Sequence, residues 1–390
     1  MLVSIETHPI QYHAPVYRAL ENEFDIPVTV IYGSDFSVAG YYDPEFGASF
    51  AWDTDLLSGY RPLFLSRVSN GGAASVEKVS SAGLSRVLRA LSPQAVLIGG
   101  YGHNYHRVGF YAAWRNGLPI LFRAETSDIT RQRGLPRRLV RDATLRWWYQ
   151  KCARLLFIGE RSRDHYRRLG VVDDRLVFSP YCIDSSPFET TEEARQRLRS
   201  EQRSLMGIAD DRTVILFSGK LSRLKGPDLL VRALKQMEKQ LRETVTVVFV
   251  GSGELETDLR SAADCEPSVD VRFAGFQNQR QLSPFYHAAD LLVLPSHSET
   301  WGLVINEALS HGLPCVTSSN VGCANDLIRA GRTGEVFKAG SAQSLISAIK
   351  RSYSLIRRLD VREQCREKVA GYTVSKAAQG IAEAYKAVTC

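Results

Sequence analysis

The chain has 390 residues, of which 44% are hydrophobic and 23% are charged, and its formal net charge is +7. This length is enough for two globular domains of ordinary size, and the composition does not indicate disorder. No stretch is long and apolar enough to span a membrane, and the first residues, MLVSIETHPIQY, lack the basic and then apolar pattern of a signal peptide. We therefore expect a cytoplasmic globular protein.

Short apolar runs alternate with longer amphipathic segments along the chain. Continuous apolar strands separated by helices are typical of parallel sheets that helices cover on both faces. In the first half the predicted strands are 2–7, 26–33, 95–100, 119–125, 154–160 and 175–181. In the second half they are 213–220, 245–253, 269–276, 289–296, 313–319 and 333–337, and segments such as 226–241, 302–311 and 341–357 are predicted helices.

A charged segment that begins at Ser185 separates these two series of strands. The pattern predicts two doubly wound α/β domains, the first over residues 1–184 and the second over residues 185–372. In such sheets, ligands bind outside the carboxyl ends of the strands. The residues directly after each apolar run are therefore the candidates for a functional site.

In the second half, these strand ends carry small residues and cations. Lys220 and Lys225 flank the turn after the first strand, and residues 301–304 open a helix whose unpaired N–H groups favour an anion. Glycines at the strand ends would let a ligand approach the backbone closely. They are Gly219, Gly251, Gly253 and Gly275. Two ammonium groups beside a helix N-terminus predict an anion site, most naturally for a diphosphate.

The stretch SETWGLVINEALSHGLP contains two glutamates, Glu299 before this helix and Glu307 two turns inside it. Glu299 is placed to accept hydrogen bonds from hydroxyl groups near the anion, and Glu307 to hold a second diol away from it. A diol, a diphosphate and a second diol are the outline of a nucleotide sugar. Taken alone, a pair of glutamates at this spacing is more often a cap residue followed by a solvated helix face.

The second half resembles the retaining glycosyltransferases of family 4, which have the GT-B fold. The resemblance rests on the two glutamates with seven residues between them, on the loop SGKLSRLKGPDLL, and on FVGSGELETDL, VRFAGF, YHAADLLVLPS and TGEVF in the same order. It implies two Rossmann-like domains that face each other across a cleft. It also implies that a last helix, 373–390, packs back on the first domain.

The resemblance implies a role for each residue of the second site. Lys220 and Lys225 would bind the diphosphate and, with Glu299, carry the catalysis. The amides of Gly302 and Leu303 would contact the phosphates, Glu307 the ribose, and the turn at Gly275 and Phe276 the base. The implied donor-binding set is Gly219, Gly251, Gly275, Phe276, Thr300, Trp301, Gly302, Leu303 and Glu307.

The activity that the resemblance implies is hexosyl transfer from a nucleoside-diphosphate sugar, UDP- or GDP-linked, to a hydroxyl-bearing acceptor. That acceptor would be a glycan, a lipid-linked glycan or a small metabolite. Retention would proceed by attack on the same face, and no metal or other cofactor is expected. Two other functions stay open: a nucleotide-sugar epimerase of the same fold, and a protein that binds a sugar nucleotide without catalysis.

The first half departs from the family, because the first strand is followed by THPIQYH where many members have a glycine-rich loop. His8 and Gln11 in this loop are candidates for the acceptor side of the cleft, and mere loop polarity is the alternative. His103 follows the glycines of LIGGYGHNYH and has the same two interpretations. Arg123 and Glu125 end another strand, where they either face the acceptor or form a structural ion pair.

The sequence offers no convincing metal site. The seven cysteines include no CxxC pair, which indicates neither a zinc site nor a disulfide framework. Asp53 and Asp55 form an Asp-x-Asp pair that could suggest a metal-bound diphosphate, but so short a pattern is common by chance.

The positive charge is concentrated in residues 131–168, which carry twelve Lys or Arg against three acidic residues. A helix packed on its sheet with a solvated basic rim explains this patch. Contact with anionic lipid at the inner face of the membrane is the functional alternative. Nucleic acid is a poor third, because no nucleic-acid-binding motif accompanies the patch.

Overall fold

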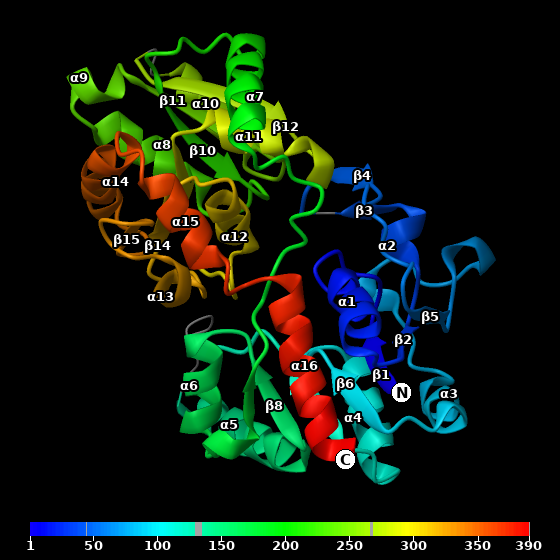
Figure 1. Cartoon of the computed structure of the whole chain (residues 1–390). Coiled ribbons are helices and arrows are strands. Elements are labelled where there is room, and N and C mark those ends of the chain that lie inside the picture. Colours follow the sequence, from blue (N-terminus) through cyan, green and yellow to red (C-terminus); the bar gives the residue numbers. More distant parts are fainter. Residues whose placement is uncertain (44, 129–134, 266–267, 390) are drawn as a thin grey trace. The chain divides into compact units, whose positions relative to one another are not determined.

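The computed structural model describes residues 1–43, 45–128, 135–265 and 268–389 (Figure 1). The chain divides into two compact units. The first contains residues 1–41, 50–184 and 372–390, and the second contains residues 42–49 and 185–371. The short segment 42–49, which lies within the expected first domain, groups with the second unit.

The sheet of the first unit has seven parallel strands in the order β5-β2-β1-β6-β7-β8-β9. The chain winds outward in one direction from β1 and in the other from β6, so the point between these neighbours is the topological switch point of a doubly wound sheet. The strands are β1 (Leu2–Glu6), β2 (Val28–Tyr32), β5 (Arg61–Phe64), β6 (Ala95–Ile98), β7 (Ile120–Arg123), β8 (Arg154–Phe157) and β9 (Leu176–Phe178).

Helices cover both faces of this sheet because successive strand residues point to opposite sides. On β1, Leu2 packs in one apolar cluster with α1 (Ala14–Phe24) and α16 (Val374–Thr389), whereas Val3 belongs to the cluster of the other face. The helices that contribute to that second cluster are α3 (Leu84–Leu91), α4 (Asn104–Arg115), α5 (Leu135–Lys151) and α6 (Glu160–Arg168). The short helix α2 (Phe36–Ala39) follows β2.

Helix α16 returns the chain to the first unit after the second unit is complete. The Ser179 hydroxyl donates to the Ala377 carbonyl at 2.8 Å, and a Cβ atom on Gly380 would stand 2.0 Å from the Phe178 carbonyl oxygen. Such a close approach of helix and strand end requires glycine at this position. The α-amino group of Met1 donates to the Tyr385 hydroxyl at 2.9 Å, which links the two ends of the described chain.

The sheet of the second unit has six parallel strands in the order β12-β11-β10-β13-β14-β15, with its switch point between β10 and β13. The strands are β10 (Thr213–Ser218), β11 (Val245–Val250), β12 (Asp270–Gly275), β13 (Leu291–Leu294), β14 (Cys315–Ser318) and β15 (Gly334–Phe337). The helices are α7 (Glu192–Leu205), α8 (Pro227–Gln236), α9 (Lys239–Arg242), α10 (Glu256–Asp264), α11 (Ser283–Ala288), α12 (Leu303–Ser310), α13 (Ala324–Leu327), α14 (Ala342–Ile356) and α15 (Val361–Val369).

All six strands predicted in the second half are present. The first half was predicted with six strands, but its sheet has a seventh, β5, and a separate two-stranded sheet joins β3 (Tyr41–Asp43) to β4 (Ala48–Phe50). Strand β5 lies at the edge of its sheet and contains Pro62. Proline has no backbone N–H, and it is tolerated in an edge strand because some N–H groups of such a strand pair with no other strand. The predicted helix 226–241 is two helices, α8 and α9.

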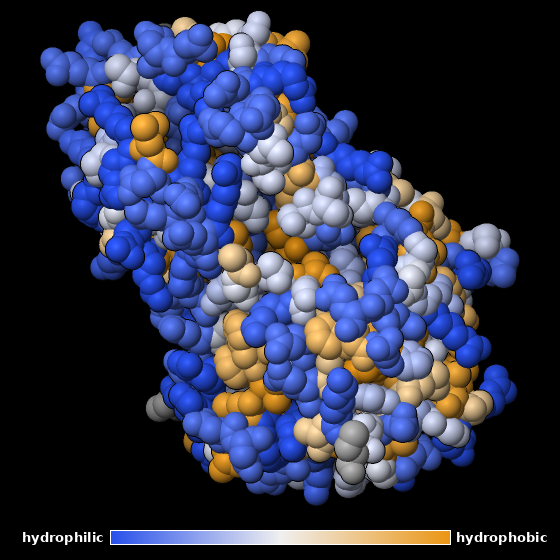
Figure 2. Space-filling model, viewed as in Figure 1, coloured by the Kyte–Doolittle hydropathy of each residue, from blue (hydrophilic) through white to orange (hydrophobic). Residues whose placement is uncertain are grey.

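Within the described residues, no helix is both long and apolar enough to cross a membrane. Figure 2 shows that hydrophilic side chains cover most of the visible face of the second unit.

Candidate active site

Two loops meet at the switch point of the second sheet. The loop 219–226 follows β10 and the segment 295–302 follows β13. The amide of His297 donates to the Leu224 carbonyl at 2.8 Å, and a Cβ atom on Gly226 would stand 2.9 Å from the Pro295 carbonyl oxygen. This contact brings two sets of predicted site residues together.

Lys225 and Glu299 form an ion pair at this junction. The Lys225 ammonium contacts Oε2 of Glu299, and the two side chains are 30% and 12% exposed. Backbone hydrogen bonds hold the Glu299 residue on both sides, from its own amide to Asn320 at 3.3 Å and from the Gly322 amide to its carbonyl at 3.1 Å. The structure therefore fixes a carboxylate and a cation beside each other at the point where ligands of doubly wound sheets bind.

The predicted glycines end neighbouring strands with their backbones in close contact. Gly251 donates to the Gly275 carbonyl at 2.8 Å, and a Cβ atom on Gly251 would stand 2.0 Å from the Gly219 carbonyl oxygen. All three have positive φ angles, 141° at Gly219, 130° at Gly251 and 69° at Gly275. A side chain at Gly251 would clash, so this close approach depends on glycine.

Helix α12 begins at Leu303 after Gly302, whose φ of 98° places it in the left-handed region. The sequence predicts that the first backbone N–H groups of this helix bind an anion. Trp301 just before them is 3% exposed, and its indole N–H donates to Asn306 Oδ1 at 2.9 Å. Its ring therefore packs inside the unit, whereas Thr300 is exposed.

Glu307 lies inside the unit, 4% exposed. The Tyr286 hydroxyl donates to one carboxylate oxygen at 2.5 Å, and the Gln279 amide nitrogen donates to the other at 3.2 Å. Burial raises the pKa of this carboxyl above its usual range, and the two hydrogen bonds oppose that rise. Each oxygen still has a further lone pair with which it can accept from a ligand hydroxyl.

Lys220 and Phe276 contact a segment that the sequence did not connect with the site, residues 42–49. The Lys220 ammonium lies 3.1 Å from Asp43 and 2.5 Å from Glu45, and 4.9 Å from the ring centre of Phe46. The Phe46 ring stands edge-on to Phe276 at 5.1 Å. No spacing signal along the chain could have found this contact, because it joins residues more than 170 positions apart.

At the carboxyl end of β1, in the first unit, Glu6 is 3% exposed and is held by two donors. Its Oε1 accepts from the Tyr17 hydroxyl at 2.5 Å and from His13 Nδ1 at 2.9 Å. Burial alone would raise the pKa of this carboxyl, but the charge and hydrogen bond of His13, together with His106, lower it well below its usual range. A carboxylate at the end of an apolar strand was the signal that could have identified Glu6.

The predicted acceptor-side residues of the same unit lie in different surroundings. The His8 Nδ1 atom forms a hydrogen bond with the Thr7 hydroxyl at 2.9 Å, and the His8 ring lies against Phe36. Burial lowers the pKa of His8 to about 4. Gln11 is buried, and its side-chain oxygen has no hydrogen-bond partner among the residues described. His103 is exposed at the start of α4, and its ring lies 6.0 Å from that of His106.

Arg123 holds the chain after β9. Its guanidinium donates to the Ser179 hydroxyl at 2.9 Å and to the Pro180 carbonyl at 2.6 Å, and it lies 5.5 Å from the ring centre of Tyr181. Glu125 is exposed. Burial of Tyr181 raises the pKa of its hydroxyl well above the usual range, and the charge of Glu125 raises it further. The contacts of Arg123 show a guanidinium committed to the backbone of its own unit.

The Asp-x-Asp pair occurs in a turn. Asp55 accepts from the amides of Leu57 at 3.0 Å and Ser58 at 3.2 Å, which lowers its pKa. In the described part of the chain, no three His, Cys, Asp or Glu side chains gather as metal ligands would.

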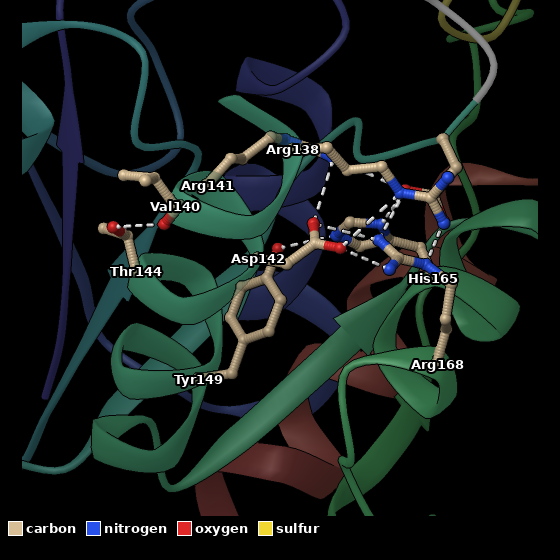
Figure 3. A network of polar contacts seen from close by, with 9 residues as sticks. Arg138, Val140, Arg141, Asp142, Thr144, Tyr149, His165 and Arg168 are labelled. Carbon is tan, nitrogen blue, oxygen red and sulfur yellow. Dashed lines mark hydrogen bonds and ion pairs between the residues drawn. The ribbon is translucent and has the colours of Figure 1, made fainter. Parts of the chain in front are cut away.

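The basic patch is partly neutralised, as Figure 3 shows. Arg168 pairs with Asp128 at 2.7 Å and with Asp142 at 2.5 Å, and Arg141 lies 3.4 Å from Asp128. His165 Nδ1 also contacts Asp128 at 2.9 Å. These contacts tie α6 to α5, so several of the patch's cations have a structural role.

The chain is similar to known glycosyltransferases in sequence and in fold. Residues 199–369 match the family described as glycosyl transferases group 1. A D-inositol 3-phosphate glycosyltransferase of Catenulispora acidiphila is 39% identical over 145 residues, which cover 35% of this chain and 34% of that protein. The matches with this and other curated relatives span about a third to three fifths of their length.

Solved structures match the whole chain. Anabaena HepE in complex with UDP and glucose has a TM-score of 0.68 at 17% identity, with 98% of each chain covered. The catalytic domain of Arabidopsis thaliana starch synthase IV, bound to ADP and acarbose, has a TM-score of 0.72 at 13% identity, with 100% of this chain and 99% of that chain covered. Residues 199–369 therefore match the group 1 glycosyl transferases, and the chain has the GT-B fold.

Proposed function

We propose that this protein is a retaining glycosyltransferase that moves a sugar from a nucleoside-diphosphate sugar to a hydroxyl-bearing acceptor. The observation that carries the proposal is the Lys225–Glu299 pair at the switch point of the second sheet, directly before the N-terminus of α12. Solved relatives of the same fold are complexes with UDP or ADP, which supports a nucleotide ligand for this unit.

The chemistry proposed for this site is mainly electrostatic. Lys220, Lys225 and the first amides of α12 stabilise charge on the departing diphosphate. Glu299 contacts the transferred sugar, and Glu307 accepts from the ribose. An oxygen of the leaving phosphate takes the proton of the acceptor hydroxyl on the face from which it departs, so the anomeric configuration is retained. No metal is required, because the cations and the helix N-terminus supply the positive charge.

The donor is proposed to be a UDP- or GDP-sugar and the acceptor a glycan, a lipid-linked glycan or a small metabolite. A thermal-shift screen of UDP, GDP, ADP and dTDP identifies the base, because a ligand that binds only the folded state raises the melting temperature.

Incubation with labelled nucleotide sugars, with and without added acceptors, tests the activity. A transferase releases nucleoside diphosphate in an acceptor-dependent way and labels the acceptor. An epimerase would convert the donor without any acceptor, and a binding protein would leave it intact. Either of the last two results contradicts the proposal.

We also propose that the first unit contacts anionic lipid through a surface on α4 and α5, made of Tyr111, Trp114, Leu139, Val140 and Trp147. Four of these side chains are exposed, and Trp147 lies 5.5 Å from Trp114. The Lys151 ammonium lies 5.7 Å from the centre of the Trp114 ring. Aromatic side chains next to cations are typical of surfaces that bind an anionic membrane interface.

The charge around this α4–α5 surface agrees with that occupant. Helix α4 contains no acidic residue, and the one acid of α5, Asp142, is buried against Arg168. Co-sedimentation with vesicles of phosphatidylglycerol and phosphatidylcholine tests the contact. Val140→Glu should abolish binding, whereas Val172→Glu, at another exposed valine of the same unit, should not. Equal binding of both variants would contradict it.

A further inference from the structure

The switch point of the first sheet carries a second set of polar groups that the proposed transfer does not use. Glu6 ends β1, and Gly99 and Gly100 follow β6, its neighbour in the sheet. His106, on the first turn of α4, stands beside them. Ligands of doubly wound sheets bind at this point, where the loops of two adjacent strands diverge.

The two oxygens of Glu6 have different surroundings. Oε1 is saturated by Tyr17 and His13, as described above. The nearest partner of Oε2 among the described residues is Nε2 of His106, at 3.8 Å. This distance is too long for a direct hydrogen bond. The ionised carboxylate thus keeps one oxygen open as an acceptor.

His106 is also incompletely satisfied. Its side chain is 7% exposed, yet neither ring nitrogen has a hydrogen-bond partner in the part of the chain that the structure describes. A buried polar group without a hydrogen-bond partner destabilises the fold, so such a group needs an explanation. An oxygen atom placed about 2.8 Å from both Oε2 of Glu6 and Nε2 of His106 could contact both atoms at once, because these two atoms are only 3.8 Å apart.

We infer that Glu6 and His106 bind a hydroxyl group of a neutral, polyhydroxylated acceptor, such as a sugar or a cyclitol. The hydroxyl donates its hydrogen to Oε2 of Glu6 and accepts from Nε2 of His106. The inference rests on the proposed function for the statement that this ligand is the acceptor.

The site favours a neutral ligand over a phosphorylated one. Glu6 is negatively charged, because its pKa is held far below its usual range. The Arg123 guanidinium, which lines a small cavity together with Glu6 and Gly99, is already committed to Ser179 and Pro180. A phosphate group here would therefore meet a carboxylate and no available guanidinium.

Gly99 keeps the open oxygen accessible. A Cβ atom on Gly99 would lie 3.4 and 3.6 Å from the two carboxylate oxygens of Glu6, in ordinary contact and without a clash. The φ angle of Gly99 is not among the positive ones, so alanine causes no backbone strain. Gly99→Ala should therefore fold normally while its methyl group takes the space of the bound hydroxyl.

Ligand-observed saturation-transfer NMR on the full chain, with UDP present in excess, tests this inference. The probes are glucose, galactose, N-acetylglucosamine and myo-inositol, each at millimolar concentration, with glucose 6-phosphate as the charged comparison. Wild type should bind at least one neutral probe and should prefer glucose to its phosphate. Gly99→Ala should weaken that binding at least fivefold.

Gly102→Ala is the matched control, because its methyl group would meet no atom within 4 Å and its φ is not positive either. It should bind the probe as wild type does. Glu6→Gln gives a second reading: its amide nitrogen replaces Oε2 and presents a donor where the hydroxyl needs an acceptor, so binding should fall as well. Equal binding by wild type and Gly99→Ala, or no binding of any neutral probe, overturns the inference.

Affinity for UDP and release of nucleoside diphosphate from the donor are measured on the same proteins. If the probes bind as expected but no donor is consumed, the proposed transferase function fails and the hydroxyl site stands. If the donor is consumed equally by wild type and Gly99→Ala and no neutral probe binds, the hydroxyl site fails and the proposed function stands.

Discussion

Replacement of Glu299 by glutamine separates donor binding from turnover. Without a ligand, the carboxylate of Glu299 holds the Lys225 ammonium that the diphosphate needs, and both side chains are partly exposed. An ion pair of this exposure is worth about 1 kcal/mol, or roughly a fivefold change in an equilibrium constant. Glu299→Gln removes this competition, so the affinity for nucleoside diphosphate should rise by up to about fivefold.

Turnover should change in the opposite direction. If Glu299 contacts the transferred sugar while charge develops on its anomeric carbon, loss of the carboxylate charge lowers kcat, by about tenfold or more, because that interaction is stronger in the transition state. The combination of tighter diphosphate binding and slower transfer is specific to this arrangement.

Calorimetry with the cognate nucleoside diphosphate on four proteins measures the effect: wild type, Glu299→Gln, Lys225→Met and the double variant. Lys225→Met should weaken binding by roughly 1.5–3 kcal/mol, the range for a charge-assisted hydrogen bond. In the Lys225→Met background, Glu299→Gln should no longer tighten binding, because the cation that it frees is absent. Weaker binding to Glu299→Gln than to wild type would refute the reasoning.

Three further predictions follow from other parts of the structure. Burial lowers the pKa of His311 to about 3, so this imidazole stays neutral in the folded protein at pH values where it would be protonated in the unfolded chain. The contribution of His311 to the free energy of unfolding is therefore complete above its ordinary pKa of 6.5 and falls as the pH drops towards 3, by about 2 kcal/mol at pH 5. Urea unfolding at pH 7.5 and pH 5 should show this loss in wild type and a smaller one in His311→Gln; equal losses would contradict it. Arg203 is 1% exposed and pairs with Asp290 at 2.7 Å, and Arg199 pairs with the same carboxylate. Arg203→Met removes one charge-assisted hydrogen bond but leaves Asp290 paired, so it should destabilise the second unit by roughly 1.5–3 kcal/mol in the same assay. A change below about 1 kcal/mol would show that the Arg203–Asp290 pair is unimportant. EDTA should leave transfer nearly unchanged, whereas a strict need for Mg²⁺ or Mn²⁺ would bring Asp53 and Asp55 back into consideration.

The second unit was the easier one to predict. Its strands are continuous apolar runs, so the sequence predicts where they end, and Lys225 and Glu299 were proposed as site residues because they follow these ends. Their contact depends on loops 219–226 and 295–302 adjoining at the switch point, which strand order decides. Strand order cannot be read from local periodicity.

The missed features depend on long-range contacts or on atypical strands. The segment 42–49 packs against Lys220 although it is remote in sequence, and β5 contains Pro62 and lies at a sheet edge. In the first unit the sequence drew attention to His8 and Gln11 but passed over Glu6, because a carboxylate inside an apolar strand pattern is usually assigned to an exposed face. The carboxylate oxygens of Glu6 come to lie next to their donors only when α1 and α4 pack around β1.

The return of α16 to the first unit has a consequence for the order in which the protein folds. The second unit is complete once residue 371 has been synthesised, but the apolar cluster on one face of the first sheet includes Ala377, Ile381 and Ala384 of α16. During synthesis the first unit must therefore wait, with Leu97, Leu121 and Leu156 uncovered on that face, until the whole second unit has left the ribosome. The unit that is synthesised first is thus the last to finish its core, and a released chain truncated after residue 371 should have a protease-resistant second unit and a protease-sensitive first one.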